Sequence, residues 1–233
     1  LRQLSQHGDR ISELLFVQQG RLLATTSLDK TLRVFDVRSG QQVHSLKGHE
    51  AMQAEAAAPD GRHLAVGYRD GSLQLWDIVD GRIVMNLVGH TSAVRSLSFS
   101  PDGRHLLSGS SDKTARVFEV ATGKTVHVIT TDDRVSFVRF ASDGQKMAIA
   151  SNDKTVRLWS LSLGEILTLR GHEEQAVRVD FSADGHFLAS GDASGMILLW
   201  DGRTGDLLRK LRGHDERVND LRFTPDGEHL VSV

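Results

Sequence analysis

The sequence predicts an all-β fold, a β-propeller of four-stranded antiparallel blades, because three turn markers recur in step along it. The first marker is Gly-His or its equivalent, and it recurs every 41 or 42 residues, at His7, His49, His90, Thr131, His172 and His214. The second is mostly Asp-Gly, with its glycine at Gly20, Gly61, Gly103, Gly144, Gly185 and Gly227. The third is a glycine at Gly40, Gly81, Gly123, Gly164 and Gly205. Three markers with one period indicate a single repeated supersecondary unit.

The third repeat shows the elements of this unit most clearly. Alternating apolar residues predict strands over 94–99, 105–109, 114–120 and 125–129. Tight turns are predicted between them, at Pro101-Asp102-Gly103, Ser111-Asp112-Lys113 and Thr122-Gly123. A lone four-stranded sheet has two apolar faces and no core of its own. We therefore expect the copies to stack face to face and to close radially.

The repeats divide the chain into one continuous domain over 1–233. We expect residues 1–6 to be the outer strand of a preceding blade and residues 214–233 to be a truncated repeat. Five full repeats lie between them, at 7–48, 49–89, 90–130, 131–171 and 172–213. This arrangement predicts five complete blades with partial blades beside them, in a segment of a larger protein whose intact ring has six or seven blades.

Residues 51–58 are the one window whose composition conflicts with this assignment. Alanine, methionine, glutamine and glutamate favour a helix where the second repeat requires its first strand. Gly-His before the window and Pro-Asp-Gly after it keep the repeat register. We therefore expect a strand here, but a poorly packed one.

The overall composition excludes several classes of function. A net charge of −2 gives no reason to expect a nucleic-acid partner. No apolar run approaches the length of about 18 residues that a membrane span needs, so no membrane partner is expected. The sequence contains no cysteine, which excludes disulfides and thiolate metal sites. That absence fits a reducing compartment, and we expect a cytoplasmic protein.

The residues that open and close the repeats resemble those of the WD-repeat family of propellers. Gly-His opens four of them, at His49, His90, His172 and His214, and Trp-Asp closes two, at Trp76-Asp77 and Trp200-Asp201. Degenerate forms of this close are Phe35-Asp36, Phe118-Glu119 and Trp159-Ser160. The resemblance covers essentially the whole chain. It implies a rigid disk that binds peptides or protein domains on its loop-rich face, without enzymatic activity or a cofactor.

The resemblance also implies a hydrogen-bonded network in each blade, made by a loop histidine, a second-strand Ser or Thr, a turn aspartate and a third-strand tryptophan. The matching positions are His7, Thr25, Asp29, His49, Asp70, Trp76, His90, Ser108, Asp112, Asp153, Trp159, His172, Ser190, Trp200 and His214. No repeat carries all four members, since Phe35 and Phe118 replace tryptophan and Ser194 stands in place of the acid in repeat five. We expect His–Asp pairs without the complete network, and packing to contribute more to stability.

Three further patterns are explained better by structure than by chemistry. Ser-x-x-Lys, the nucleophile motif of penicillin-binding enzymes, ends at Lys30, Lys113 and Lys154, but each copy lies in a predicted turn rather than at the start of a helix. The repeat histidines fall one to a blade and cannot converge on an ion, so we expect no metal site. Glu13, Glu55 and Asp220 share a position on the first strand and are the only candidates for acid–base chemistry in the channel.

Acidic residues follow the repeat histidine on loops that should open on one face of the disk. We name them the acidic loop residues: Asp9, Glu50, Asp132, Asp133, Glu173, Glu174, Asp215 and Glu216. This circle could receive a basic peptide, with Arg69 on a neighbouring turn as a further partner contact. The alternative is that these loop tips are polar only because they are exposed to solvent. In that case the basic residues on neighbouring turns reduce the negative electrostatic potential of the face: Lys30, Arg69, Lys113 and Lys154.

The expected function is a non-catalytic scaffold for protein–protein interaction on the loop face, a hypothesis that rests on family analogy. A second hypothesis is a regulatory or sensory module of a multidomain signalling protein, joined to a kinase or ATPase domain. A third is a propeller enzyme or ligand binder, which requires acid–base or metal residues grouped on neighbouring inner strands around the channel.

Overall fold

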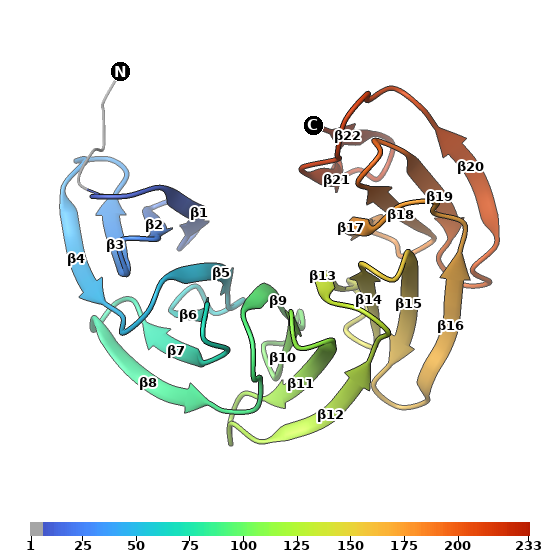
Figure 1. Cartoon of the computed structure of the whole chain (residues 1–233). Coiled ribbons are helices and arrows are strands. Elements are labelled where there is room, and N and C mark those ends of the chain that lie inside the picture. Colours follow the sequence, from blue (N-terminus) through green and yellow to red (C-terminus); the bar gives the residue numbers. More distant parts are fainter. Residues whose placement is uncertain (1–6) are drawn as a thin grey trace.

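The fold is an arc of antiparallel β-sheets arranged around a central channel (Figure 1). The computed structural model describes residues 7–233, apart from the side chains of residues 165 and 166. These residues form 22 strands and no helix. The described part of the chain therefore offers no helix that could cross a membrane. Residues 1–6, which were predicted to form an outer strand, lie outside the described residues.

The first three blades each contain four strands in sequence order. Blade one contains β1 (Ile11–Val17), β2 (Leu22–Ser27), β3 (Thr31–Asp36) and β4 (Gln42–Lys47). Blade two contains β5 (Met52–Ala57), β6 (His63–Tyr68), β7 (Leu73–Asp77) and β8 (Arg82–Leu87). Blade three contains β9 (Val94–Phe99), β10 (His105–Ser110), β11 (Thr114–Glu119) and β12 (Thr125–Thr130).

Two more complete blades and a partial one follow. Blade four contains β13 (Val135–Phe140), β14 (Lys146–Ser151), β15 (Thr155–Ser160) and β16 (Gly164–Arg170). Blade five contains β17 (Ala176–Phe181), β18 (Phe187–Asp192), β19 (Ile197–Asp201) and β20 (Leu207–Leu211). Blade six holds only β21 (Leu221–Phe223) and β22 (Leu230–Ser232). The predicted all-β propeller of five complete four-stranded blades and a partial blade is therefore confirmed.

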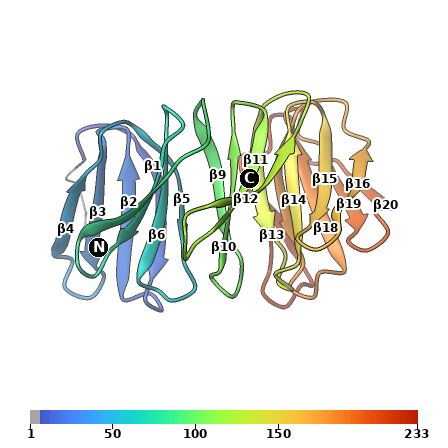
Figure 2. The same ribbon diagram turned by 90° about the horizontal axis from the view of Figure 1, so that it is seen from below.

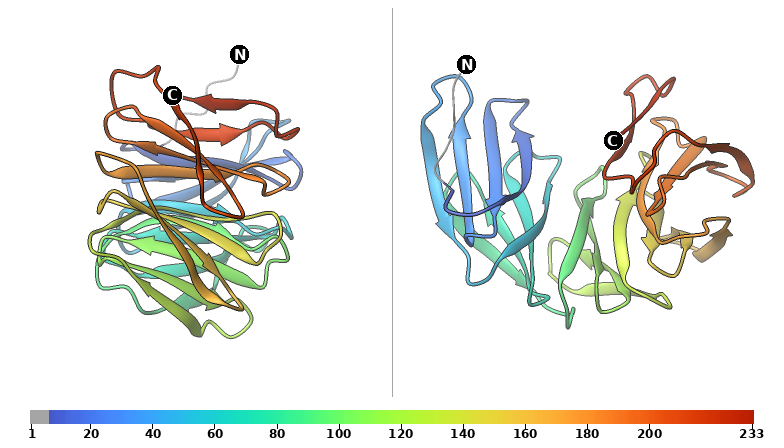
Figure 3. Two further views of the ribbon diagram at one scale, coloured as in Figure 1. Left: turned by 90° about the vertical axis from the view of Figure 1, so that its right-hand side faces the viewer. Right: turned by 45° about the horizontal axis from the view of Figure 1, so that its top comes forward.

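The first strand of each blade lies next to the channel and the fourth strand lies on the outside (Figure 1). Seen from the side, the strands run between two layers of loops (Figure 2). Blade one and the β21–β22 sheet stand on the two sides of a gap, so the ring does not close (Figure 3). Each loop from an outer strand to the next inner strand thus crosses one end of the disk toward the channel.

The turns follow the chemistry that the sequence predicts. Gly103 has φ of +71° and donates its N–H to the carbonyl of Ser100 at 2.9 Å, which closes the turn between β9 and β10. The turn between the second and third strands uses a lysine with φ near +70° in blades one, three and four, at Lys30, Lys113 and Lys154. The three Ser-x-x-Lys copies therefore lie in strand-to-strand turns and not at the start of a helix.

The core lies between neighbouring blades. One buried cluster joins Ala54 and Leu75 of blade two to Leu97 and Phe118 of blade three. The blades approach so closely that a Cβ on Gly109 would lie 2.5 Å from the side chain of Val135 in the next blade. Each blade therefore needs its neighbours to bury both faces, as expected for a radial repeat.

The helix-prone window at 51–58 does form the innermost strand of blade two. It is not poorly packed against its own blade, since Met52 is fully buried and Ala54 is 1% exposed. Repeat register overrides local propensity here because the strand is paired along β6 and covered by blade one. Its small side chains leave space on the channel side, where Ala56 and Ala57 line a cavity of about 420 Å³.

Strand register corrects the expectation that Glu13 and Glu55 share a position. Glu13 pairs with Thr26, whereas Glu55 pairs with Val66, one position further along the strand. The residues at the position of Glu55 in the other blades are Leu14, Leu97, Val138, Val179 and Leu221. Glu55 therefore occupies an apolar site. Glu55 follows Glu13 by 42 residues, a repeat spacing that suggests equivalent positions. In the structure, however, equivalent positions on the first strands of blades one and two are 41 residues apart, as Leu14 and Glu55 are.

Candidate interaction face and central channel

Blade five contains a complete four-member network at the loop face. The indole N–H of Trp200 donates to Ser190 Oγ at 2.8 Å, and Ser190 Oγ lies 2.6 Å from His172 Nε2. The other ring nitrogen, Nδ1, lies 2.9 Å from Asp192 Oδ2. Burial lowers the pKa of His172, so its ring is neutral near pH 7 and donates a single N–H.

The sequence prediction that no blade completes the network is wrong for blade five. Asp192 and Ser194 have exchanged the places that Ser and Asp take in the turns of blades one, three and four. Asp192 still accepts from the backbone N–H and the hydroxyl of Ser194, at 2.9 and 2.7 Å, and reaches the same histidine. An aspartate 20 residues after the repeat histidine, instead of 22, was the signal that the sequence analysis missed.

Blades one and three hold three members each, with a phenylalanine where tryptophan would stand. His7 lies 2.8 Å from Thr25 Oγ1 and 3.0 Å from Asp29 Oδ2. His90 makes the equivalent contacts with Ser108 at 2.7 Å and Asp112 at 2.8 Å. The His–Asp pairs form there without an indole donor. Although burial opposes it, hydrogen bonds from Thr114 and His90 lower the pKa of Asp112 below its ordinary range.

Blade two has a weaker version of this arrangement. His49 lies 3.0 Å from Asp70 Oδ2 and 2.9 Å from Ser72 Oγ, but the side chains of His49 and Asp70 are 48% and 45% exposed. The buried indole N–H of Trp76 makes no well-formed hydrogen bond among the described residues, because Val66 occupies the Ser or Thr position, and the group near it is the Tyr68 hydroxyl. In blade six, His214 Nε2 lies 2.7 Å from Ser232 Oγ.

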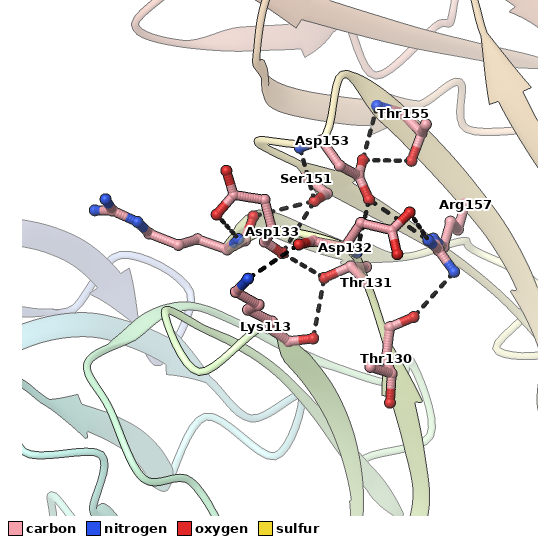
Figure 4. Close-up of polar contacts among 10 residues, drawn as sticks. Lys113, Thr130, Thr131, Asp132, Asp133, Ser151, Asp153, Thr155 and Arg157 are labelled. Carbon is pink, nitrogen blue, oxygen red and sulfur yellow. Dashed lines mark hydrogen bonds and ion pairs between the residues drawn. The ribbon is translucent and has the colours of Figure 1, made fainter.

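Blade four replaces the histidine with an arginine from the third strand (Figure 4). Arg157 Nη2 lies 3.4 Å from Asp153 Oδ2 and 3.8 Å from Asp132 Oδ2, while Nη1 donates to the Thr130 carbonyl at 2.9 Å. Thr131 takes the histidine position and donates to the carbonyl of Asp133 at 2.6 Å. This cation and these hydrogen bonds hold the acidic loop of blade four in place. Trp159 of the same blade packs edge-on against His127.

The acidic loop residues all lie on the histidine end of the disk, but lysines of the preceding blade reach several of these loops. Lys113 Nζ donates to the carbonyl of Asp132 at 3.1 Å, and Lys154 Nζ donates to that of Glu173. Ion pairs join Lys30 to Glu50 at 3.6 Å and Lys154 to Glu174 at 3.8 Å. The Ser-x-x-Lys lysine thus links one blade to the next. Within residues 7–233, Asp9, Asp215 and Glu216 have no such cation.

The channel wall carries ion-paired side chains in its deeper part. Arg139 Nε lies 2.9 Å from Asp180 Oδ1, and Arg178 Nε lies 3.7 Å from Asp220 Oδ1. The guanidinium of Arg178 stands 4.9 Å from the centre of the Phe137 ring. A third arginine, Arg222, shares both aspartates, at 3.9 Å from Asp180 Oδ1 and 3.8 Å from Asp220 Oδ2, so three cations pair with two carboxylates near this ring.

The channel acids also serve as acceptors for backbone N–H groups of the next blade. Glu13 Oε2 accepts from the N–H of Glu55 at 3.0 Å, and Asp180 Oδ2 accepts from that of Phe223 at 2.9 Å. Ser96 accepts from Val138 in the same way, at 3.1 Å. Glu13 is therefore part of the contact between blades one and two, not a free acid in the channel.

The family model for the IFT122 first beta-propeller matches residues 52–233, and the model for the WD domain, G-beta repeat matches residues 1–36. The chain belongs to the family of the IFT122 first beta-propeller. The predicted resemblance to WD-repeat propellers is thereby confirmed over both parts of the chain.

One surface group in this WD-repeat propeller has the chemistry of metal ligands. Ligand atoms of Asp226, Glu228 and His229 lie within 4.8 Å of one another, and all three residues are exposed. Asp226 Oδ1 already accepts from the N–H of Glu228 at 3.0 Å and from the Thr224 hydroxyl. The turn between β21 and β22 therefore explains this grouping without an ion.

Proposed function

We propose that this propeller is a non-catalytic scaffold that binds protein partners on its histidine-containing loop face. WD-repeat propellers generally bind proteins, and this supports the coarse assignment. The observation that carries it further is the contrast between a rigid network beneath the loops and exposed charges on them. His172 and Asp192 are buried, whereas Glu173 and Glu174, directly after His172, are exposed.

A basic segment is the partner that these loops favour. Glu173, Glu174, Asp215 and Glu216 come from neighbouring loops at blades five and six. A groove between these loops is lined by Glu173 and Asp215, together with Met196 and one cation, Arg212. Complementary charge raises the encounter rate and selects among partners more than it supplies affinity. The best surface for a basic partner is therefore the part of the rim at blades five and six.

Affinity capture with the intact protein tests this proposal. Partners are captured with the wild type, with Glu173→Lys plus Glu174→Lys, and with Glu228→Lys, which changes an exposed acid in the β21–β22 turn away from these loops. Wild type and Glu228→Lys should retain the same partners, and the double variant should lose them. Partners that survive the double charge reversal unchanged would remove blade five from the interaction surface.

Two finer assignments are proposals of the same kind. The scaffold could regulate an attached domain, such as a kinase or an ATPase, in a multidomain signalling protein. Determining which domains share its polypeptide decides this, and finding only further propeller repeats would count against it. A cytoplasmic location is supported by the absence of cysteine from the sequence.

A further inference from the structure

Four arginines gather at the mouth of the channel on the loop face. Arg95, Arg134 and Arg217 line a cavity of about 240 Å³, and Arg69 is close enough to Arg95 to act on its charge. They come from different blades: Arg69 from the β6–β7 turn, Arg95 from β9, and Arg134 and Arg217 from the loops before β13 and β21. The acidic loop residues belong to loops of the same face, which run inward from an outer strand to the next inner strand (Figure 1), and Asp133 and Glu216 directly precede Arg134 and Arg217 in the chain.

The positive charge at this mouth is not compensated by ion pairs. None of these four arginines forms an ion pair with a carboxylate among the described residues, in contrast to Arg139, Arg178 and Arg222 deeper in the channel. Arg95 has only a neutral acceptor, with its Nε donating to Ser111 Oγ at 2.8 Å. Desolvation and the neighbouring Arg134 and Arg69 lower the pKa of Arg95, which means that like charges repel there.

An anion at this position would relieve that repulsion and accept charge-assisted hydrogen bonds. The cavity also contains neutral polar groups that can assist. Ser136 donates to the amide oxygen of Asn152 at 2.5 Å, which leaves the NH₂ group of Asn152 as a donor. Gln175 lines the same cavity. The volume is that of a side chain, not of an extended polymer.

We infer that the channel mouth binds an anionic side chain, a carboxylate or a phosphate, carried by an acidic segment of a partner protein. The inference rests on the proposed scaffold function and names a second chemical feature of the partner. A nucleic-acid backbone fits less well, because its phosphates would also meet the exposed Asp132, Glu173 and Asp215 around the mouth. A single anionic side chain needs to place only one charged group at the arginines, so it makes fewer contacts with these acidic residues than an extended polyanion does.

Fluorescence anisotropy with the intact protein and three labelled peptides tests the inference. The peptides share a Gly-Ser frame with a central Glu-Glu, a central phosphoserine or a central Gln-Gln. We expect the Glu or the phosphoserine peptide, or both, to bind at least about tenfold more tightly than the Gln peptide, a difference of about 1.4 kcal/mol. Their relative affinities identify the source of the anion.

Variants then locate the site. Arg95→Gln plus Arg134→Gln should abolish the preference for the anionic peptide, while Arg104→Gln, in the β9–β10 turn at the opposite end of the disk, should keep it. Glu173→Gln plus Glu174→Gln should also keep this preference. The variant therefore distinguishes loss of anion binding by the arginines from loss of basic-partner binding by the acidic loop residues. Thermal unfolding confirms that each variant is folded.

Three results would overturn the inference. The first is equal binding of the Glu, phosphoserine and Gln peptides, including no binding of any of them up to about 1 mM. The second is an anion preference that the Arg95 and Arg134 double variant retains. The third is a labelled single-stranded DNA that binds more tightly than either anionic peptide and depends on the same two arginines, which would assign the mouth to nucleic acid.

Discussion

Replacing Glu55 with leucine should make this propeller more stable. Glu55 is 4% exposed, and neither of its carboxyl oxygens makes a well-formed hydrogen bond among the described residues, although the nearby Thr26 hydroxyl partly offsets the rise in its pKa. A buried polar group without a partner costs about 1–3 kcal/mol. Every other blade places leucine or valine at this position, so the site between the blades accepts an apolar side chain of that size.

The expected gain is about 2 kcal/mol in the free energy of unfolding, taken from the middle of that range. For a chain of this length, 1 kcal/mol corresponds to about 2–4 °C in Tm. Glu55→Leu should therefore raise Tm by about 4–8 °C, measured by circular dichroism or calorimetry at pH 7. The matched control is Leu97→Glu, which puts a carboxyl into the same register position of blade three and should destabilise the protein strongly.

The stability difference between Glu55→Leu and the wild type should also depend on pH. Burial and the nearby Glu13 carboxyl raise the pKa of Glu55 well above its ordinary value of 4.5. Above pH 4.5 the folded state therefore keeps a proton that the unfolded chain releases. This term lowers the wild-type free energy of unfolding by up to about 1.4 kcal/mol per pH unit until the folded pKa is passed. The advantage of Glu55→Leu should grow over the same window.

Two results would refute this chain of argument. A Glu55→Leu protein that is no more stable than the wild type at pH 7 would show that the carboxyl has partners or water that satisfy it. A stability difference that stays constant between pH 4.5 and pH 8 would show that the pKa of Glu55 is not raised by folding. Urea unfolding at several pH values measures both quantities.

Three further predictions concern the networks and the contacts between blades. Trp200→Phe should lower the free energy of unfolding, measured with urea, by about 1 kcal/mol, because the Trp200 indole N–H has a hydrogen-bond partner. Trp76→Phe should leave this free energy unchanged or raise it. Equal losses in the two variants would contradict the assignment of the networks. His172→Ala should lower the free energy of unfolding by about 2–4 kcal/mol and His49→Ala by less than about 1 kcal/mol, because His172 is buried and His49 is exposed. The reverse order would be inconsistent with the geometry. Gly109→Ala should lower stability by about 1–3 kcal/mol because its Cβ would press on the next blade, and an unchanged Tm would show that the blades can move apart.

The network beneath the loops shows where sequence reasoning fails at the scale of one residue. The contacts of His7 with Asp29 and of His90 with Asp112 are those that the resemblance to WD-repeat propellers implies, at the positions that the repeat spacing assigns. Asp192 does not, because a carboxylate can reach the same histidine from two turn positions. The choice depends on side-chain reach and backbone dihedrals, which a spacing rule does not contain.

By itself, the sequence determined the repeat, its four-stranded unit and the turns between strands, because these depend on local alternation and on residues that tolerate turn dihedrals. Only the tertiary structure decided which side chains meet across blades. Arg134 and Arg217 share one repeat position, three residues after the Gly-His position, but Arg69 and Arg95 occupy two others, so no single periodicity connects the four. They converge because the blades are arranged radially, which brings residues distant in sequence to one mouth, and Glu55 is buried for the same reason.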